Sequence, residues 1–308
     1  MVLPLVYHPS YSYDFPDQHR FAMVKFRYLY EFLRQQGVAR AENLYRSGPC
    51  LSKWLVAAHC PDYLQRLRTG TLSKKEVREL GLPWSENLAR RSFISPGGTV
   101  LTALLAMQRG IACHLAGGTH HAHYDKASGF CCLNDLAVTA LAMLEQPGIN
   151  RVLIFDCDVH QGDGTAAILS ERDDAYTCSI HCEKNFPVRK QRSNLDVGLA
   201  DGIEDEAYLE IVASTLQRCL DRVRPDLVLY DAGVDVYTAD PLGRANISWQ
   251  GLERRDRLVL RAVRERAIPI ATVIGGGYDD DRWQLARRHA IVVQQALALL
   301  HEELAARA

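Results

Sequence analysis

The sequence predicts an α/β fold with a mainly parallel sheet, and three features of the chain indicate it. Several short apolar runs have the length and composition of strands that are buried on both faces. Segments with a helical spacing of apolar residues separate most of these runs. A polar or glycine-rich segment directly follows four of them, as at the ligand-binding edge of open α/β sheets. Alternation of strands and helices favours parallel strands joined by helical crossovers.

The expected strands are, in chain order, Ile111–Leu115, Val152–Phe155, Tyr176–Ile180, Leu227–Tyr230 and Ile270–Ile274. The expected helices are Glu206–Arg222, Trp249–Arg266 and Trp283–Ala306. In the first of these helices, Leu209, Val212 and Leu216 recur at intervals that bring them to one face. The chain has no internal repeat and no low-complexity linker, so we expect one domain over residues 1–308.

Composition and charge exclude several classes of protein. Hydrophobic residues make up 47% and charged residues 24% of the 308 residues, which is typical of a soluble globular protein. The formal net charge of -1 gives no electrostatic argument for a nucleic-acid or membrane partner. No apolar run is long enough to span a bilayer, and Met1–Pro16 does not have the pattern of a secretory signal.

The 9 cysteines form no regular framework, which favours reduced thiols and a cytoplasmic location. Cys178 and Cys182 flank His181 and therefore raise the question of a metal site. No other cysteine pair nearby would complete such a site, so we interpret this segment as the end of a buried strand.

The polar segments that follow the strands carry most of the residues capable of chemistry. They are Gly117–His121, Asp156–His160, Asp231–Asp235 and Gly275–Tyr278. Because parallel strands present their carboxyl ends at one edge of a sheet, these four segments are expected to meet in one crevice.

Asp158 and His160 alternate along an extended segment, so their side chains point to the same side, which Asp156 shares. Carboxylate and imidazole are both good zinc ligands, and Asp235 is a plausible third. Three protein ligands with an open position describe a catalytic zinc site, in which a bound water becomes more acidic. The alternative is a polar loop whose aspartate caps the next helix.

The adjacent His120 and His121 diverge too much to bind one metal ion together, so an acid/base pair is the preferred interpretation. Gly275–Gly277 matches neither nucleotide-binding glycine motif. It is instead expected to form a close-approach turn that presents the Tyr278 phenol to a developing oxyanion, the alternative being a packed aromatic residue. His114 and His123 are interpreted as structural.

Five motifs together resemble the histone-deacetylase-like family of arginase-fold zinc deacylases. They are Gly-Gly-Thr-His-His (117–121), Gly-Phe-Cys-Cys-Leu-Asn-Asp (129–135), Asp-Cys-Asp-Val-His-Gln-Gly-Asp-Gly-Thr (156–165), Gly-Val-Asp (233–235) and Gly-Gly-Gly-Tyr (275–278). Residues 81–85 and 183–187 resemble the class IV branch and its bacterial relatives. The resemblance implies a single three-layer α/β/α domain with a mainly parallel eight-stranded sheet.

The resemblance also implies two cation sites and a substrate tunnel. The ligands of one zinc ion per chain would be Asp158, His160 and Asp235. A structural potassium ion would be bound by Asp156, Asp158, His160, Ser179 and Ile180. The stem of the substrate lysine would pass between Gly129, Phe130 and Phe186.

The catalytic roles follow from the same resemblance. His121 matches the general base that later protonates the leaving amine, and His120 matches its electrostatic partner. Asp156 and Asp163 match the carboxylates that orient the two histidines. Tyr278 matches the residue that stabilises the tetrahedral oxyanion together with zinc.

The implied reaction is hydrolysis of an N-acyl amide, with N-epsilon-acetyl-lysine in a protein or peptide as the expected substrate. Acetylpolyamine deacetylation keeps the chemistry and changes the substrate. An arginase-like dimanganese ureohydrolase would need a further carboxylate where Gly162 stands. A binding module without catalysis is opposed by the complete set of ligands, base and tyrosine.

The chain departs from many relatives at the rim of the tunnel. No residue clearly matches the acid that grips the substrate backbone, and Glu86 is the nearest candidate. The basic run Arg189, Lys190 and Arg192 is expected near the entrance, where it would disfavour a polycationic substrate.

Overall fold

Eight strands form one sheet in the order β2-β1-β3-β8-β7-β4-β5-β6, and each neighbouring pair is parallel. The structure is a computed structural model and describes residues 2–306. The strands are β1 (Leu5–Val6), β2 (Leu44–Tyr45), β3 (Ile111–His114), β4 (Val152–Asp156), β5 (Ala175–Cys182), β6 (Leu195–Leu199), β7 (Leu227–Asp231) and β8 (Ile270–Val273).

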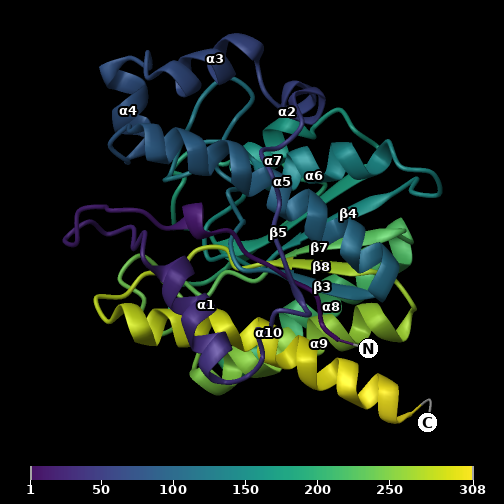
Figure 1. The fold of residues 1–308 in the computed structure, drawn as a ribbon. Coiled ribbons are helices and arrows are strands. Elements are labelled where there is room, and N and C mark those ends of the chain that lie inside the picture. The colour runs from purple at the N-terminus through teal and green to yellow at the C-terminus, as the bar shows by residue number, and fades with distance from the viewer. Residues whose placement is uncertain (1, 307–308) are drawn as a thin grey trace.

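Helices cover both faces of this sheet in two groups (Figure 1). The first group comprises α2 (Ser52–Ala58), α3 (Pro61–Thr69), α4 (Lys74–Leu80), α5 (Glu86–Arg109), α6 (Asp135–Leu144) and α7 (Asp163–Ile168). The second comprises α1 (Lys25–Gln35), α8 (Asp205–Val223), α9 (Trp249–Glu265) and α10 (Arg282–Ala305). This arrangement confirms the predicted three-layer α/β/α fold with a parallel eight-stranded sheet.

The five strands and three helices expected from the sequence lie where they were predicted, with ends that differ by no more than two residues. Three strands were not predicted. β1 and β2 are too short for a period to be visible, and β6 alternates between exposed and half-buried residues. The segment with Cys178, His181 and Cys182 is a buried part of β5, as predicted, and both thiols are free.

The sharp start of α6 positions the histidine segment of the chain. Asn134 caps this helix because its side chain accepts a hydrogen bond from the Ala137 amide (2.9 Å). The same side chain donates to the carbonyls of His120 (3.2 Å) and Ala122 (3.1 Å). The helix cap therefore also fixes the backbone around the two adjacent histidines.

The register of the central strands brings acidic residues together at one edge. Asp156 at the end of β4 pairs with Asp231 at the end of β7. The chain then turns away from the sheet in loops that carry the remaining polar motifs. No helix in the part of the chain that the structure describes has the length and apolar character needed to cross a bilayer.

Candidate active site

Asp158, His160 and Asp235 form a buried group at the carboxyl edge of β4 and β7. The Nδ1 atom of His160 lies 3.1 Å from Asp158 Oδ1 and 3.1 Å from Asp235 Oδ2. Backbone amides hold the carboxylates in place: Val159 N donates to Asp235 Oδ1 (2.8 Å), and Gly276 N donates to Asp158 Oδ2 (2.6 Å). Backbone amides thus orient the side-chain atoms that could bind a metal ion.

The chemistry of this group fits a divalent metal ion. Burial opposes charge on His160, but hydrogen bonds with Asp158 and Asp235 raise its pKa to about 10. Burial and the neighbouring Asp158 raise the pKa of Asp235 to about 6. Two carboxylates this close repel one another, and a cation between them would relieve that repulsion. A Cβ atom at Gly276 would collide with both carboxylates, so glycine is needed for this close approach.

His120 and His121 each bond to a carboxylate through Nδ1. His120 Nδ1 donates to Asp156 Oδ2 (2.7 Å), and His121 Nδ1 donates to Asp163 Oδ1 (2.6 Å). The two Nε2 atoms face each other at 3.2 Å. The bond to Asp163 fixes the tautomer of His121, so its unprotonated Nε2 can act as a base, and this nitrogen lies within hydrogen-bonding distance of His120.

The surrounding charges and burial shift the pKa values of His120 and His121 in opposite directions. Burial disfavours charge on His120, but Asp156 and Asp158 raise its pKa well above the usual value. Burial lowers the pKa of His121 to about 4, and the charge of His120 acts in the same direction. At neutral pH His121 is therefore neutral, which is the protonation state that a general base requires, and the neighbouring His120 is cationic.

His123, interpreted from the sequence as structural, contacts this machinery. Its Nε2 donates to Asp163 Oδ2 (3.0 Å), so one carboxylate is shared by His121 and His123. Burial favours the neutral acid at Asp163, but these two hydrogen bonds hold its pKa well below the usual range. His123 therefore helps to keep the partner of His121 ionised. His114, by contrast, is buried against Thr99 and Tyr11, away from the site.

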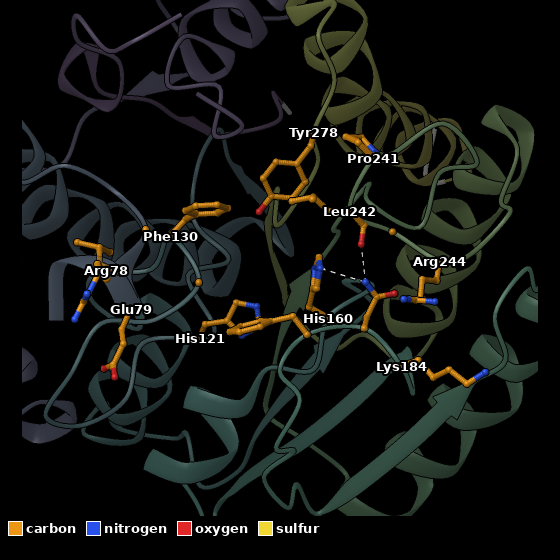
Figure 2. Close-up of a pocket in the computed structure, with 16 residues that line it drawn as sticks. Arg78, Glu79, His121, Phe130, His160, Lys184, Pro241, Leu242, Arg244 and Tyr278 are labelled. Atoms are coloured by element: carbon orange, nitrogen blue, oxygen red, sulfur yellow. Dashed lines mark hydrogen bonds between the residues drawn. The ribbon is translucent and has the colours of Figure 1, made fainter. Parts of the chain in front are cut away.

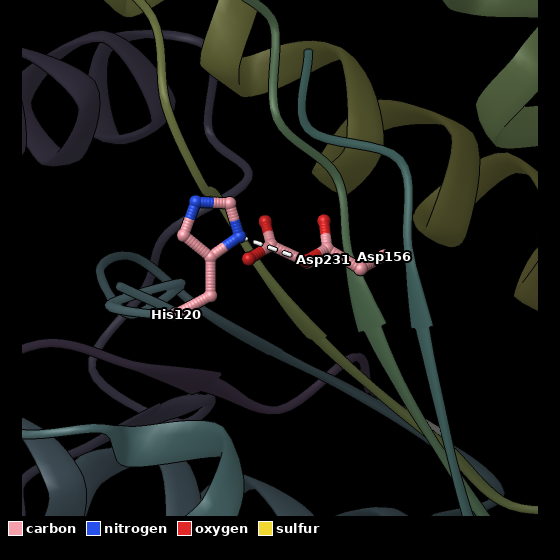
Figure 3. Close-up of side chains that lie close together, drawn as sticks. All are labelled: His120, Asp156 and Asp231. Carbon is pink, nitrogen blue, oxygen red and sulfur yellow. Dashed lines mark hydrogen bonds and ion pairs between the residues drawn. The ribbon is translucent and has the colours of Figure 1, made fainter. Parts of the chain in front are cut away.

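Asp231 lies beside His120 and Asp156 at the end of β7 (Figure 3). It is fully buried, and neither of its carboxylate oxygens has a hydrogen-bond partner among residues 2–306. Burial and the charge of Asp156 raise its pKa well above the usual value, so the neutral acid is favoured. The sequence placed Asp231 at a strand end but gave no reason to assign it a role.

The residues expected to bind potassium lie on two adjacent strands and the following loop. Asp156 pairs in register with Ser179, and Ile180 follows on β5. The Ser179 hydroxyl lies 2.9 Å from His181 Nδ1, and Asp156 Oδ1 accepts a hydrogen bond from Asp158 N (3.0 Å). The potassium site stays a prediction.

A pocket of about 650 Å³ opens over the histidines (Figure 2). Its inner wall is formed by His121, Gly129, Phe130, His160, Phe186 and Tyr278. The rings of His121 and Phe186 meet edge to face at 4.8 Å. A Cβ atom at Gly129 would lie 2.6 Å from the His121 ring and 3.0 Å from that of Phe186. Glycine is therefore required for a narrow passage between these walls.

Tyr278 lies opposite His121, with its hydroxyl directed into the pocket (Figure 2). Its backbone amide donates to Asp240 Oδ2 (2.7 Å), and its carbonyl accepts from Arg288 Nη2 (3.1 Å). Burial, followed by the charge of Asp235, raises the pKa of the phenol well above the usual value. Tyr278 therefore remains a hydrogen-bond donor at neutral pH.

Two further residues beside the pocket were not identified from the sequence. Asn185 places its amide nitrogen 3.4 Å from His160 Nε2 and donates to the Leu242 carbonyl (2.6 Å). Asp240 accepts hydrogen bonds from the backbone of Tyr278 and Leu242. Both connect functional residues to loops that are remote in the sequence.

The mouth of the pocket differs from the expectation. Glu86 is in the first turn of α5 and does not line the pocket, whereas Glu79 does. None of Arg189, Lys190 and Arg192 lines the pocket, and Lys190 turns inward to the carbonyls of Asn185 (2.6 Å) and Pro187 (2.7 Å). Arg192 lines a separate hollow. The basic residues at the mouth are instead Arg78, Lys184 and Arg244 (Figure 2).

Sequence comparison identifies the family to which the chain is similar. The model of the histone deacetylase domain matches residues 19–295. An uncharacterized protein of Picosynechococcus is 46% identical over 296 residues, which cover 96% of this chain and 99% of that protein. Histone deacetylase 2 of Arabidopsis thaliana is 28% identical, covering 89% of this chain and 74% of that protein.

Two further similarities extend the comparison. The acetoin utilization protein AcuC of Staphylococcus aureus is 30% identical over 263 residues, covering 78% of this chain and 67% of that protein. The crystal structure of a histone deacetylase homologue complexed with SAHA has a TM-score of 0.79 and 23% sequence identity, covering 96% of this chain and 84% of that one. This second similarity concerns the fold.

Proposed function

The chain belongs to the histone deacetylase family, and from that premise we propose that it is a zinc-dependent deacylase of N-epsilon-acyl-lysine. One observation carries the proposal: His121 and Tyr278 face each other across a narrow pocket, beside a buried Asp–His–Asp group (Figure 2). The three parts supply a base, an oxyanion donor and a metal site, which amide hydrolysis requires together.

Asp158, His160 and Asp235 would hold the zinc ion. When bound, the ion supplies a Lewis acid for the amide carbonyl and lowers the pKa of a water molecule. His121 Nε2 takes the proton of the attacking water, while the ionised Asp163 on Nδ1 keeps the ring in the required tautomer. The same nitrogen then delivers a proton to the leaving amine.

The other side chains of the pocket act on charge and position. Tyr278 donates its hydroxyl hydrogen bond to the developing oxyanion. His120, held cationic by Asp156, stabilises negative charge beside the base without transferring a proton itself. Phe130 and Phe186 exclude water and fit a thin, unbranched stem such as the four methylenes of lysine.

Gly162 disfavours the alternative function, that of a dimanganese ureohydrolase. That reaction would need a carboxylate at this position to bind a second ion. A Cβ atom at Gly162 would lie 2.6 Å from Asp156 Oδ2, so a larger side chain has no room beside the His120–Asp156 pair. One metal ion per chain is the composition that the proposal requires.

We expect an acetyl-lysine peptide to be hydrolysed with a higher kcat/KM than acetylspermidine or acetylputrescine. The mouth carries Arg78, Lys184 and Arg244 but only one acid, Glu79. Asp201 lies close by but is shared between Lys184 (3.6 Å) and Arg244 (3.1 Å). The mouth therefore repels a polycation. A panel of the three substrates with zinc-loaded protein measures this, and a clear preference for either acetylpolyamine would refute the assignment of lysine as substrate.

Reversal of charge at the mouth should change this selectivity. Arg78→Glu is expected to raise kcat/KM for acetylspermidine by roughly 2- to 10-fold, because a long-range repulsion becomes an attraction. The neutral acetyl-lysine peptide should be affected far less. Arg218→Glu is the matched control, since Arg218 is an exposed arginine on α8 that does not line the pocket. Equal responses in the two variants would mean that the mouth does not select by charge.

A further inference from the structure

Lys25 is a buried lysine that the reaction proposed above leaves without a role. It stands at the first position of α1, and only 2% of its surface is exposed. Its ammonium group makes no ion pair with a carboxylate among residues 2–306; it lies over the rings of Phe21 (5.4 Å), Phe26 (5.5 Å) and Tyr278 (5.9 Å). Burial lowers its pKa to about 8 against the opposing charge of Asp235. A buried cation without a counter-ion is costly, so its position requires an explanation.

The hydrogen bonds of the glycine turn supply that explanation. Between residues 275 and 278, the carbonyl of Gly276 accepts from Val234 N (2.8 Å), and that of Tyr278 accepts from Arg288. The two remaining carbonyls have one donor in the described chain, the ammonium of Lys25, which is 3.4 Å from Gly275 O and 3.5 Å from Gly277 O. The lysine thus bridges both ends of the turn.

The other hydrogen bonds of the turn hold Gly276 and Tyr278, through Asp158 and Asp240, and leave the conformation of Gly275 and Gly277 to Lys25. Gly275 and Gly277 have positive φ values of 61° and 153°, which glycine adopts easily. Because glycine also adopts many other conformations easily, its own backbone preferences do not fix the turn. Both carbonyls face a buried region in which an unpaired oxygen is unfavourable. Because Tyr278 directly follows the turn, a change in the turn would move the tyrosine hydroxyl.

We propose that Lys25 is a positioning residue, whose ammonium bridges the carbonyls of Gly275 and Gly277 and so holds the Tyr278 hydroxyl where the oxyanion forms. This inference rests on the proposed function for its kinetic consequences. The bridge between the carbonyls is independent of that function, because it concerns the geometry of the turn alone.

The test is a double-mutant cycle with Lys25→Met and Tyr278→Phe, assayed on an acetyl-lysine peptide. Lys25→Met keeps an unbranched side chain that is one atom shorter, and it removes the donors. Misplacement of a catalytic group by about 1 Å can cost roughly 100-fold, so we expect kcat to fall by about 10- to 100-fold with little change in KM. In the Tyr278→Phe background, Lys25→Met should cause almost no further loss. Multiplicative losses would overturn the proposal, since they would mean that Lys25 acts independently of Tyr278.

A second readout does not depend on turnover. In protein labelled with 3-fluorotyrosine, the ¹⁹F resonance that disappears in Tyr278→Phe belongs to Tyr278. It should shift or broaden in Lys25→Met, and an unchanged resonance would contradict the proposal even if the protein hydrolysed no acyl-lysine. Absence of turnover in the unmodified protein would instead refute the proposed function. Lys25→Leu, which likewise has no donor, replaces the methionine variant if that variant does not fold, and the same cycle and resonance then decide.

Discussion

Replacement of Asp235 by alanine is expected to remove the bound metal and the activity together. Asp235 Oδ2 lies 3.1 Å from the Nδ1 atom of His160, so its carboxylate supplies one of the three ligand atoms of the proposed zinc site. Loss of partners outside the ligand set typically lowers metal affinity by 10- to 100-fold, and loss of a ligand should exceed that. Elemental analysis of the dialysed variant, beside an assay with an acetyl-lysine peptide, measures both quantities.

Asp163→Asn is the matched control for this experiment. Asp163 is also a buried carboxylate bonded to a histidine, but it contacts His121 and His123 and lies outside the metal group. We expect this variant to keep one metal ion per chain and to lose activity through the altered base. Full metal content in Asp235→Ala would remove Asp235 from the site.

The sequence predicts the part of the fold from Ile111 onward better than the part before it. From Ile111 onward, buried parallel strands appear as continuous apolar runs, and the helices between them have one apolar face. The segment before Ile111 shows no such difference between strand-like and helix-like patterns. Helix α5 contains Pro96, Gly97 and Gly98 in its interior, residues that normally end a helix. The structure explains Gly98: a Cβ atom there would collide with Tyr11 and His114, so close packing outweighs helix propensity.

The candidate site could likewise be predicted only in part from the sequence. Residues that directly follow strands could be placed together from the sequence, because the edge of a parallel sheet is a fixed meeting point. Asn185 and Glu79 line the pocket from a loop and a helix end, and Asp240 contacts it only through the backbone of Tyr278 and Leu242. Nothing in the local sequence of these residues indicates those positions. Lys25 resembles an ordinary polar residue at a helix start, and its burial beside Phe21, Phe26 and Tyr278 is visible only in the structure.

His121→Ala and Tyr278→Phe are expected to retain the metal and to lose most turnover. Neither side chain belongs to the Asp158–His160–Asp235 group. A positioned general base contributes roughly 100- to 10,000-fold to the rate, and an oxyanion donor roughly 100- to 1,000-fold. The losses should appear mainly in kcat, because both groups act on charges that develop in the transition state. Steady-state kinetics on an acetyl-lysine peptide and metal analysis of the same samples measure the two effects.

The variant His120→Ala distinguishes the role of His120 from that of His121 in the same experiment. The cationic His120 lies 3.2 Å from His121 Nε2 and lowers the pKa of His121. Without that charge, His121 should become more basic, so activity should fall less than in His121→Ala and its pH dependence should shift upward. Equal losses with unchanged pH profiles in both variants would contradict the division of roles. Turnover close to that of the unmodified protein in Tyr278→Phe would refute the oxyanion role, because no other phenol in the described chain lines this pocket.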